Sequence, residues 1–410
     1  MLWSVGLRRL IRYGALEVVD AHGELHHFGQ VGVTACRIRL HDASLHWKLL
    51  LNPKLHVGEA YTDGTLTIEQ GTLQEVLFLF ARNIHAMNDQ PEGRIERFIS
   101  PMLNRIIQFN PLARSRRNVA HHYDLSNDFY RLFLDADMQY SCAYFARPEI
   151  TLEEAQEAKK AHIAAKLLLR PGMKVLDIGC GWGGMAMYLA QRYDVEVTGI
   201  TLSQAQLELG QQRVREAGLE GKVQLHLRDY RHETGQYDRI VSVGMFEHVG
   251  PAHYAAFFDT VRERLTPDGV ALLHAIGRSD GPGIANAWVR KYIFPGAGAA
   301  ALSEVIPTIE SSGLWMTDAE ILRLHYAETL AHWHQRFAQH RAAIAQQYDE
   351  RFCRMWEFYL AATEAFFRYG GLMVFQLQLA RRIDAVPITR DYITESDARA
   401  STVRPVPRAA

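Results

Sequence analysis

The sequence predicts an α/β protein whose larger part is a doubly wound, mostly parallel sheet with extra helices. Two observations lead to this prediction. Between residues 174 and 275, apolar runs of strand length alternate with helical stretches, as in parallel strands joined by crossover helices. The first predicted strand ends in a glycine-rich turn that opens a helix. Ahead of this part, residues 1–90 predict a small α+β domain, and 410 residues suffice for two cores.

The N-terminal domain, residues 1–90, shows the patterns of short strands followed by a helix. Four strands are expected, at residues 16–19, 24–28, 37–40 and 65–68. The first two flank a turn at 21–23, and the third alternates basic and apolar residues as a half-buried strand does. Residues 58–64 are rich in turn formers, and residues 73–87 predict an amphipathic helix. This domain contains no recognisable catalytic cluster.

Residues 91–118 predict a basic amphipathic linker helix. Apolar residues recur there at helical spacing, and the segment has many more arginines than acids: Arg94, Arg97, Arg105, Arg114, Arg116 and Arg117. Such a helix lies on an anionic membrane surface. It is equally typical of a linker packed between domains with a solvated basic face. The sequence leaves both interpretations open.

Residues 119–390 form the predicted catalytic domain. Its strands are expected at residues 174–178, 195–200, 223–227, 239–243 and 270–275. Helices are expected at residues 153–169, 204–217, 252–265, 318–330, 332–347 and 352–382. Residues 391–410 are rich in Pro, Arg and Ala and predict a flexible tail.

Composition excludes several classes of protein. A formal net charge of −1 gives no sign of a nucleic-acid partner, so any membrane affinity must come from local patches. The four cysteines show no paired spacing, which favours a reducing cytoplasm. No apolar run is long enough to span a bilayer, so a membrane would be contacted peripherally. His332 and His334 are two residues apart on a predicted helix and point to different faces, and no metal site is expected.

The glycine-rich turn is the most informative local motif. Asp177, Gly179, Gly181 and Gly183 have the spacing used by S-adenosylmethionine (SAM) methyltransferases. Glycines let backbone N–H groups approach a nucleotide-like ligand without a Cβ clash. Gly179 and Gly181, with Gly184, also satisfy the dinucleotide-binding pattern, so the glycines alone do not decide. The preceding Asp177 favours SAM.

Ligands of an open parallel sheet bind outside the carboxyl ends of its strands. The second strand ends in Thr201 rather than in an acidic residue, which weakens the dinucleotide interpretation. The adenosine must then be held by hydroxyl, amide and aromatic groups, with Gln206 a candidate. Asp229 and Tyr230 follow the third strand and suit an adenine, since a carboxylate accepts from its amine and a ring supports its face. Asp229 is alternatively a helix cap.

Three further positions have chemical potential and plain structural alternatives. Glu247 and His248 directly follow the fourth strand. They are interpreted either as acid–base or ligand-orienting groups, or as a pair that caps the next helix. His274 interrupts an apolar strand, where a histidine is usually a satisfied core residue. Cys142 is a nucleophile, an orienting group or a buried residue, and the lack of an adjacent base makes the nucleophile the weakest option. Aromatic segments at residues 122–130 and 138–145 suit a sulfonium cation, or are ordinary core.

Together these segments resemble the cyclopropane-fatty-acyl-phospholipid synthases, whose pattern is shared with mycolic acid cyclopropane synthases. Six motifs occur in family order across about residues 119–385: 123–130, 140–145, the glycine turn, 200–203, 246–250 and 292–296. The resemblance implies a Rossmann-like SAM methyltransferase sheet. Residues 58–64 resemble the N-terminal domain of the phospholipid enzymes, which the mycolic acid enzymes lack, and this favours a phospholipid substrate.

The resemblance also implies roles for individual residues. A bicarbonate ion beside the SAM methyl group would be held by Cys142, Glu247, His274 and Tyr326. SAM itself would be contacted by Tyr140, Gly179, Gly181, Gly183, Thr201, Gln206, Asp229 and Tyr230. Two departures stand out. The family often has Gly-Gly after Tyr-Ile-Phe-Pro, whereas residues 296–299 of this chain alternate Gly and Ala. Some members have a late cysteine that has been proposed as catalytic, and the matching residues 361–366 of this chain contain no cysteine.

The expected activity is transfer of a methylene unit from SAM across the cis double bond of a phospholipid acyl chain. The implied partners are an unsaturated membrane phospholipid, an anionic membrane surface and a second copy of the chain, joined partly through residues 1–90. Three alternatives stay open: a SAM-dependent lipid C-methyltransferase that leaves a methyl branch, a small-molecule methyltransferase of the same family, and a non-catalytic lipid-binding protein.

Overall fold

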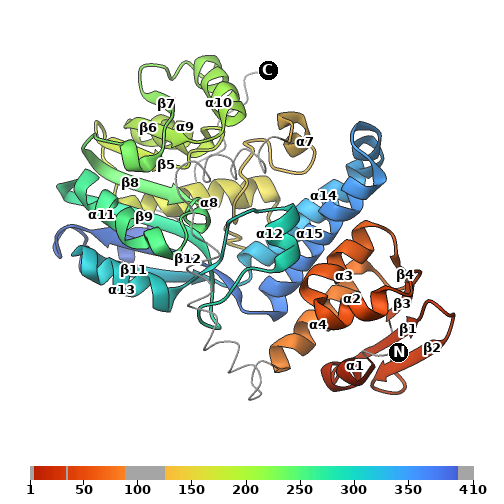
Figure 1. Cartoon of the computed structure of the whole chain (residues 1–410). Coiled ribbons are helices and arrows are strands. Elements are labelled where there is room, and N and C mark those ends of the chain that lie inside the picture. Colours follow the sequence, from red (N-terminus) through yellow and green to blue (C-terminus); the bar gives the residue numbers. More distant parts are fainter. Residues whose placement is uncertain (1–3, 34–35, 88–124, 396–410) are drawn as a thin grey trace.

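A computed structural model describes residues 4–33, 36–87 and 125–395 of the chain. They form a large α/β domain and a small α+β domain, and the small domain packs chiefly against one long helix of the large domain, α15 (Glu350–Tyr369) (Figure 1). The predicted linker helix at residues 91–118 lies outside the described residues.

The small domain contains a four-stranded sheet in the order β2-β1-β3-β4, with helices beside it (Figure 1). Its elements are α1 (Ser4–Leu10), β1 (Ala15–Val19), β2 (Leu25–Gly29), β3 (Cys36–Leu40), α2 (Leu45–Leu51), α3 (Pro53–Thr62), β4 (Leu66–Gln70) and α4 (Leu73–Met87). β1 pairs antiparallel with β2 and parallel with β3. The four predicted strands and the helix at 73–87 are therefore present.

Residues 58–62 were expected in a turn but are helical. Pro53 begins α3, where a missing N–H costs no helical hydrogen bond, and the helix continues to Thr62. Gly58 is needed for packing rather than for a turn, because a Cβ there would lie 2.6 Å from the ring of Trp288 on α12 (Ala287–Tyr292). The turn is limited to Asp63 and Gly64.

The large sheet has the order β11-β12-β9-β8-β5-β6-β7, with the short β10 paired to β9. Its strands are β5 (Lys174–Ile178), β6 (Glu196–Thr201), β7 (Val223–Leu227), β8 (Tyr237–Val243), β9 (Leu265–Arg278), β10 (Ala300–Ala301), β11 (Trp315–Leu322) and β12 (Leu372–Ala380). β5 to β9 are parallel, as predicted. β12 lies between β9 and β11 and is antiparallel to both.

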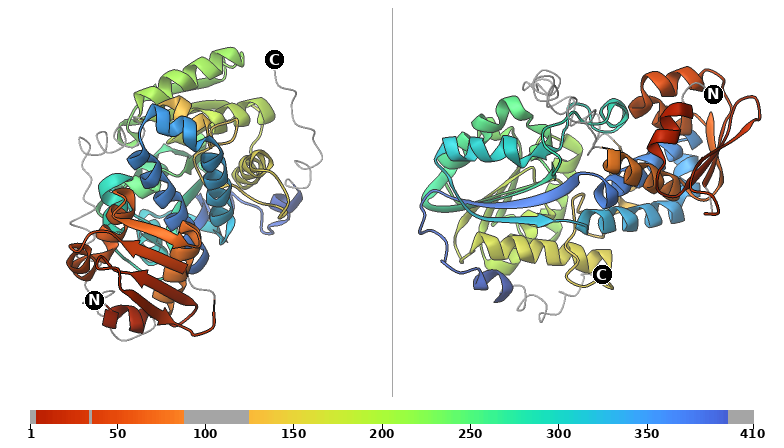
Figure 2. Two further views of the ribbon diagram at one scale, coloured as in Figure 1. Left: turned by 90° about the vertical axis from the view of Figure 1, so that its right-hand side faces the viewer. Right: turned by 90° about the horizontal axis from the view of Figure 1, so that it is seen from below.

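Helices cover both faces of this sheet (Figure 2, right). The helices of the domain are α7 (Asn127–Arg131), α8 (Leu152–Leu167), α9 (Gly184–Tyr193), α10 (Gln204–Glu216), α11 (Tyr254–Arg264), α12, α13 (Leu302–Ser312), α14 (His325–Gln347) and α15 (Glu350–Tyr369), with single turns η1 (Tyr230–His232), η2 (Phe246–His248) and η3 (Pro251–His253). α8, α9 and α10 share one apolar cluster with the sheet, and α11 and α13 share another. The result is the predicted doubly wound architecture.

Two segments that were expected to be helical are strands. Residues 318–322 belong to β11, so α14 begins only at His325, and residues 372–380 form β12. Almost all of β12 is buried because strands pair with it on both sides and helices cover its faces. A strand buried in this way does not alternate in polarity, so its pattern resembles that of a buried helix.

The long hairpin of α14 and α15 joins the two domains. α15 packs on α3 and α4, and the blue hairpin in Figure 1 rises between the two parts. Polar contacts add to this interface: Glu59 accepts hydrogen bonds from Lys291 Nζ at 2.7 Å and from the Tyr292 hydroxyl at 2.8 Å. Burial alone would raise the pKa of Glu59, but these donors lower it to about 2.

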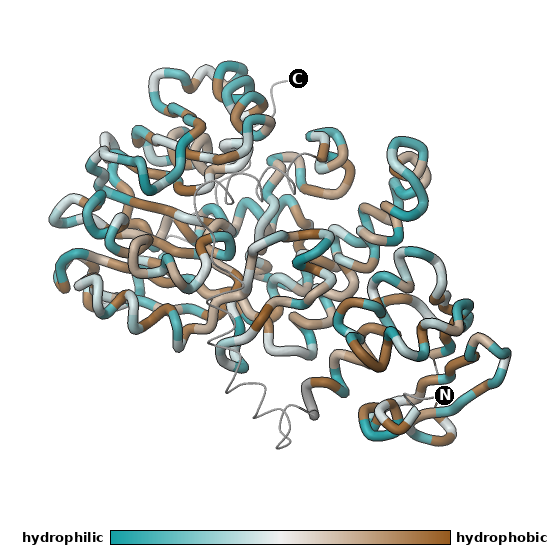
Figure 3. The backbone as a smooth tube through the Cα atoms, in the orientation of Figure 1, coloured by the Kyte–Doolittle hydropathy of each residue, from teal (hydrophilic) through white to brown (hydrophobic). Residues whose placement is uncertain are grey.

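Hydrophobic residues concentrate in the strands of the large sheet, whereas hydrophilic residues are frequent on the outer helices (Figure 3). Among the described residues, none of the helices combines the length and the apolar character that crossing a bilayer requires. The expected flexible tail is not frayed at its start, because residues 391–395 are helical and Ile393 is buried. Residues 396–410 lie outside the described part of the chain.

Candidate active site

The glycine turn follows β5 at the carboxyl edge of the sheet. Gly179 has a φ of +87°, and its N–H donates to the carbonyl of Ile200 on β6 at 2.9 Å. A Cβ at Gly179 would lie 2.7 Å from the Met245 side chain, so only glycine fits there. Gly183, with a φ of +80°, is the N-cap of α9. The turn therefore leads directly from a buried strand to a helix N-terminus, a favourable place for a nucleotide-like ligand.

A cavity opens above this turn, at the ends of β5, β6 and β8. It brings together seven of the eight residues expected to contact SAM: Tyr140, Gly179, Gly181, Thr201, Gln206, Asp229 and Tyr230. The exception is Gly183, which does not line the cavity and instead begins α9 in the left-handed conformation. The cavity is also lined by residues that the sequence did not single out, among them Gln139, Ser141, Trp182 and Arg231.

The structure confirms the capping interpretation of Asp229, and Asp229 also lines the cavity. It is the N-cap of η1, since its Oδ1 accepts from the backbone N–H of Arg231 at 3.0 Å. The guanidinium of Arg231 also holds both carboxylate oxygens, each at 2.8 Å, and lies over the Tyr230 ring. Desolvation opposes the ionisation of Asp229, but these donors keep its pKa below the usual value. Asp229 is thus a fixed anion at the edge of the cavity. No local signal in the sequence marks Arg231 as its partner.

Asp177 is an unusual carboxylate at the floor of the cavity. Its side chain is 1% exposed, and its Oδ2 has no hydrogen-bond partner among the described residues. Burial raises the pKa of Asp177 to about 7, although Lys159 opposes this shift. A buried carboxylate without a partner favours a cationic ligand, because such a ligand restores the interactions that burial removed.

One wall of the cavity continues into an aromatic cluster contributed by α14 and α15. Tyr140, which lines the cavity, lies 5.1 Å from the Trp333 ring, and its hydroxyl is 2.9 Å from that of Tyr359. Tyr326 packs edge-on against Trp333 and lies 4.8 Å from the Phe367 ring. Ring faces in a dry site stabilise cations. The cluster is part of the hydrophobic core, so the core interpretation of these aromatic residues is confirmed, and their contact with a sulfonium stays a prediction.

Glu247 does not cap a helix. Its Oε1 accepts from the backbone N–H of Ile276 at 2.5 Å, at a point where β8 has ended and β9 continues. Its Oε2 is buried and has no hydrogen-bond partner among the described residues. Burial raises the pKa of Glu247 to about 7. The neighbouring His248 lines the cavity, and burial lowers its pKa to about 4, so it is neutral at pH 7.

The other three expected catalytic residues do not line the SAM cavity. His274 is two residues before Ile276 on β9 and is buried. Cys142 and Tyr326 are buried members of one hydrophobic core cluster, and Ile276 packs against that cluster. Burial raises the pKa of Cys142 far above its usual range, so it is a thiol, which disfavours the nucleophile interpretation.

Comparison with known proteins assigns the chain to a family. A family model described as mycolic acid cyclopropane synthetase matches residues 111–377. The chain belongs to this family. The family that the sequence motifs predicted is therefore confirmed.

Similar proteins extend this result. A probable fatty acid methyltransferase from Pseudomonas putida is 44% identical over 338 residues, which are 80% of this chain and 83% of that protein. The cyclopropane-fatty-acyl-phospholipid synthase of Escherichia coli (strain K12) is 36% identical over 354 residues, 86% of this chain and 90% of that protein. A solved mycolic acid cyclopropane synthase, CmaA1 complexed with SAH and CTAB, is 35% identical with a TM-score of 0.62, covering 66% of this chain and 99% of that chain.

Membership of this family makes the protein a SAM-dependent methyltransferase, and the dinucleotide alternative is wrong. The cavity fits SAM on its own chemistry. The glycine turn leaves room for the ligand, and Asp177 offers an uncompensated carboxylate to a cation. Tyr140 adds a ring face beside it.

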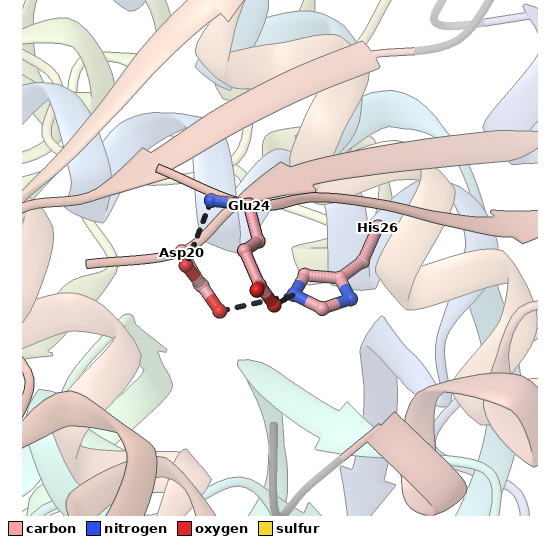
Figure 4. A group of neighbouring side chains, drawn as sticks. All are labelled: Asp20, Glu24 and His26. Atoms are coloured by element: carbon pink, nitrogen blue, oxygen red, sulfur yellow. Dashed lines mark hydrogen bonds and ion pairs between the residues drawn. The ribbon is translucent and has the colours of Figure 1, made fainter. Parts of the chain in front are cut away.

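A group of possible metal ligands in the described residues lies far from this site, on the β1–β2 hairpin (Figure 4). Asp20 Oδ1 accepts from the backbone N–H groups of His22 and Glu24, and its Oδ2 lies 3.0 Å from His26 Nε2. These contacts close the hairpin turn, so the group has a sufficient structural explanation.

Proposed function

We propose that the protein is a cyclopropane-fatty-acyl-phospholipid synthase, which transfers a methylene from SAM to the cis double bond of an unsaturated phospholipid acyl chain. Methylation of a lipid by SAM is supported by the similar proteins, which include a cyclopropane-fatty-acyl-phospholipid synthase and a probable fatty acid methyltransferase. The phospholipid is favoured because the Escherichia coli enzyme aligns with 86% of this chain. The observation that carries the chemistry is the buried Oε2 of Glu247, which has no hydrogen-bond partner among the described residues.

The reaction needs a methyl donor and a base. SAM, when bound, supplies the methyl group to the alkene as its own carbon–sulfur bond breaks, and bicarbonate, when bound, supplies the base for the proton lost on ring closure. The alkene is a weak nucleophile, so the protein contributes mainly by alignment and by stabilising positive charge. Water must be excluded, because it would trap the cationic chain as an alcohol.

Glu247 is proposed to orient the base. Its Oε1 accepts from Ile276 N–H, and its Oε2, which has no partner among the described residues, can accept a hydrogen bond from the hydroxyl of bicarbonate. His274 and the Tyr326 hydroxyl are proposed as donors to the same ion, and Cys142 as a neutral neighbour. Burial raises the pKa of Glu247, so a second negative charge beside this carboxylate needs hydrogen-bond donors to stabilise it. His274 and Tyr326 are proposed to be these donors.

The aromatic cluster is proposed to hold the acyl chain and to stabilise its cation. Tyr140 lines the SAM cavity and contacts Trp333 and Tyr359, which come from α14 and α15. Large buried rings exclude water and present electron-rich faces to positive charge. α15 is thus proposed as one wall of an acyl channel, in addition to its role in the core.

Glu247→Gln and Tyr326→Phe test the proposed base site. Both variants keep the shape of the residue, so SAM binding measured by calorimetry should be unchanged while lipid product is lost. Unchanged turnover in both would remove the assignment. Thermal unfolding of each variant controls for loss of the fold.

A lipid C-methyltransferase is the second candidate, and the identity of 44% to the probable fatty acid methyltransferase favours it. The same cation would lose a different proton and leave a methyl branch. A small-molecule substrate fits less well, because an enzyme for such a substrate would not need the N-terminal domain. A purely lipid-binding role also fits less well, because a binding protein would not need a buried Glu247 Oε2 that has no hydrogen-bond partner among the described residues.

Peripheral binding to an anionic membrane from the cytoplasm, and a homodimer joined partly through the N-terminal domain, complete the proposal. The support is the lipid substrate and the arginine-rich sequence of residues 91–118. The protein should co-sediment with anionic vesicles and be released by salt. Equal binding to neutral vesicles at any salt would contradict this, and sedimentation analysis would test the dimer.

A further inference from the structure

A row of polar side chains crosses three strands behind the proposed base site. His274 on β9 is directly opposite Gln376 on β12, and Gln376 is directly opposite Glu320 on β11. Opposite residues of antiparallel strands point to the same face. His162 and Lys166, one turn apart on α8, contact this row. The sequence did not predict this row, because the residues of β11 and β12 that contribute to it were expected to be helical.

The hydrogen bonds within this row have one direction. Lys166 Nζ donates to Gln376 Oε1 at 2.8 Å, and both side chains are buried. An ammonium group only donates, so this contact fixes which end of the Gln376 amide is oxygen. The amide nitrogen, Nε2, then faces His274 Nδ1 at 3.1 Å. An amide nitrogen also only donates, so His274 Nδ1 must be the acceptor and a neutral imidazole must carry its proton on Nε2.

The rest of the network holds Lys166 in this position. Glu320 accepts a hydrogen bond from Lys166 Nζ and lies 2.7 Å from His162 Nε2. Lys166 is 1% exposed, so its charge depends on this carboxylate. The amide orientation of Gln376 is therefore supported by an ion pair between the buried Lys166 and the partly exposed Glu320, which come from two other elements.

The charged groups around His274 keep it neutral. Burial and the positive charges of Lys159, Lys166 and His162 all lower its pKa well below the usual value, and Glu320 only partly opposes them. His274 Nε2 has no hydrogen-bond partner among the described residues. It is left to donate to a ligand.

We propose that Gln376 is a positioning residue that fixes His274 as the Nε2–H tautomer, so that the imidazole donates a hydrogen bond to the base anion and does not itself remove the proton. This inference rests on the proposed function for the anion and on the hydrogen-bond network for the tautomer. It separates two roles that a histidine at this position would otherwise combine. His274 stabilises the anion, and the proton from the transferred methyl goes to the base.

Gln376→Glu tests the tautomer. The carboxylate is the same size and still accepts from Lys166, but it turns the group facing His274 Nδ1 into an acceptor. A neutral imidazole must then carry its proton on Nδ1 and present Nε2 as an acceptor, whereas an imidazolium would carry a proton on both nitrogens. Gln378→Glu is the matched control: Gln378 is buried, two residues along the same face of β12, and bonds Tyr392 and the carbonyl of Lys166 rather than His274.

Nitrogen NMR of histidine-labelled protein, with His274 assigned by a His274→Gln variant, reads the tautomer without any turnover. The Nε2–H form is expected in the unaltered protein and in Gln378→Glu, and the Nδ1–H form in Gln376→Glu. An Nδ1–H imidazole in the unaltered protein would overturn the inference, whatever the activity proves to be.

Kinetics with SAM and unsaturated phospholipid vesicles test the consequence. kcat of Gln376→Glu should fall roughly 10- to 100-fold, as when the partner of a ligating histidine is removed at metal sites, with KM for SAM unchanged. Gln378→Glu should retain kcat. If Gln376→Glu inverts the tautomer but keeps kcat, the positioning role is wrong. Absence of any lipid product from the unaltered protein would instead overturn the proposed function, while the NMR result still decides the tautomer.

Discussion

Replacing Asp177 by Asn should make the SAM-free protein more stable at alkaline pH. Asp177 is 1% exposed at the end of β5, and its Oδ2 has no hydrogen-bond partner among the described residues. Burial raises its pKa from 3.8 to about 7, against the opposing charge of Lys159. The site therefore holds a carboxylate that the fold alone disfavours in its charged form.

The magnitude follows from the shift in pKa. The folded protein binds this proton more tightly than the unfolded chain, so its stability falls as pH rises from about 4 to about 7 and stays low above that. At about 1.4 kcal/mol per pKa unit, the full cost is roughly 4 kcal/mol at pH 8. Asn does not ionise. Asp177→Asn should therefore unfold at higher urea than the unaltered protein at pH 8, and the difference should shrink towards pH 4.

SAM binding should respond in the opposite direction. A cationic ligand needs the ionised carboxylate, so the affinity of the unaltered protein for SAM should weaken below pH 7, approaching about tenfold per pH unit. Asp177→Asn should bind SAM weakly and with little dependence on pH in this range. Urea unfolding without SAM and calorimetric titration with SAM measure the two effects. A variant that is less stable at pH 8, or a SAM affinity that is the same in both proteins across pH 5.5–8, would refute the reasoning.

Two further predictions concern the N-terminal domain. Gly58→Ala places a Cβ 2.6 Å from the buried Trp288 ring and should lower the free energy of unfolding by about 1–3 kcal/mol, measured by urea unfolding. Gly6→Ala, the same change in a helix with no atom within 4 Å, should be neutral or stabilising, and equal losses would contradict the packing argument. Burial acts to raise the pKa of Asp20, but hydrogen bonds from His26 and from two backbone N–H groups lower this pKa to about 2. Its contribution of roughly 2 kcal/mol is full above pH 4 and is lost as pH falls towards 2, so Asp20→Asn should destabilise at pH 7 and not at pH 2. A cost that is independent of pH would show that the hairpin needs the shape of Asp20 and not its charge.

The parallel part of the fold could be predicted from the sequence because its signals are local. β5, β6 and β8 are short apolar runs followed by helical stretches, and the glycine turn has a fixed spacing within a few residues. β11 and β12 gave no such signal. Gln376 is buried in β12 because it pairs with His274, and a pairing between residues so distant in sequence leaves no local pattern.

The candidate site shows the same division. Thr201, Gln206, Asp229 and Tyr230 were predictable because they follow parallel strands, whose ends meet at one edge of the sheet. The roles of His274 and Tyr326 came from family motifs, because nothing in the surrounding sequence distinguishes them from core residues. Arg231, Lys166 and the other partners that orient the site could not be predicted, since their contacts depend on where helices pack in three dimensions.

The central claim is that a methylene, and not a methyl group, is added to the acyl chain. The most direct test is mass spectrometry of phospholipids from cis-unsaturated vesicles incubated with the purified protein and SAM whose transferable methyl group is fully deuterated. The expected product has one added carbon, two deuteriums and no double bond, because the base removes one deuteron from the transferred methyl. Retention of all three deuteriums would contradict it and establish methyl branching instead.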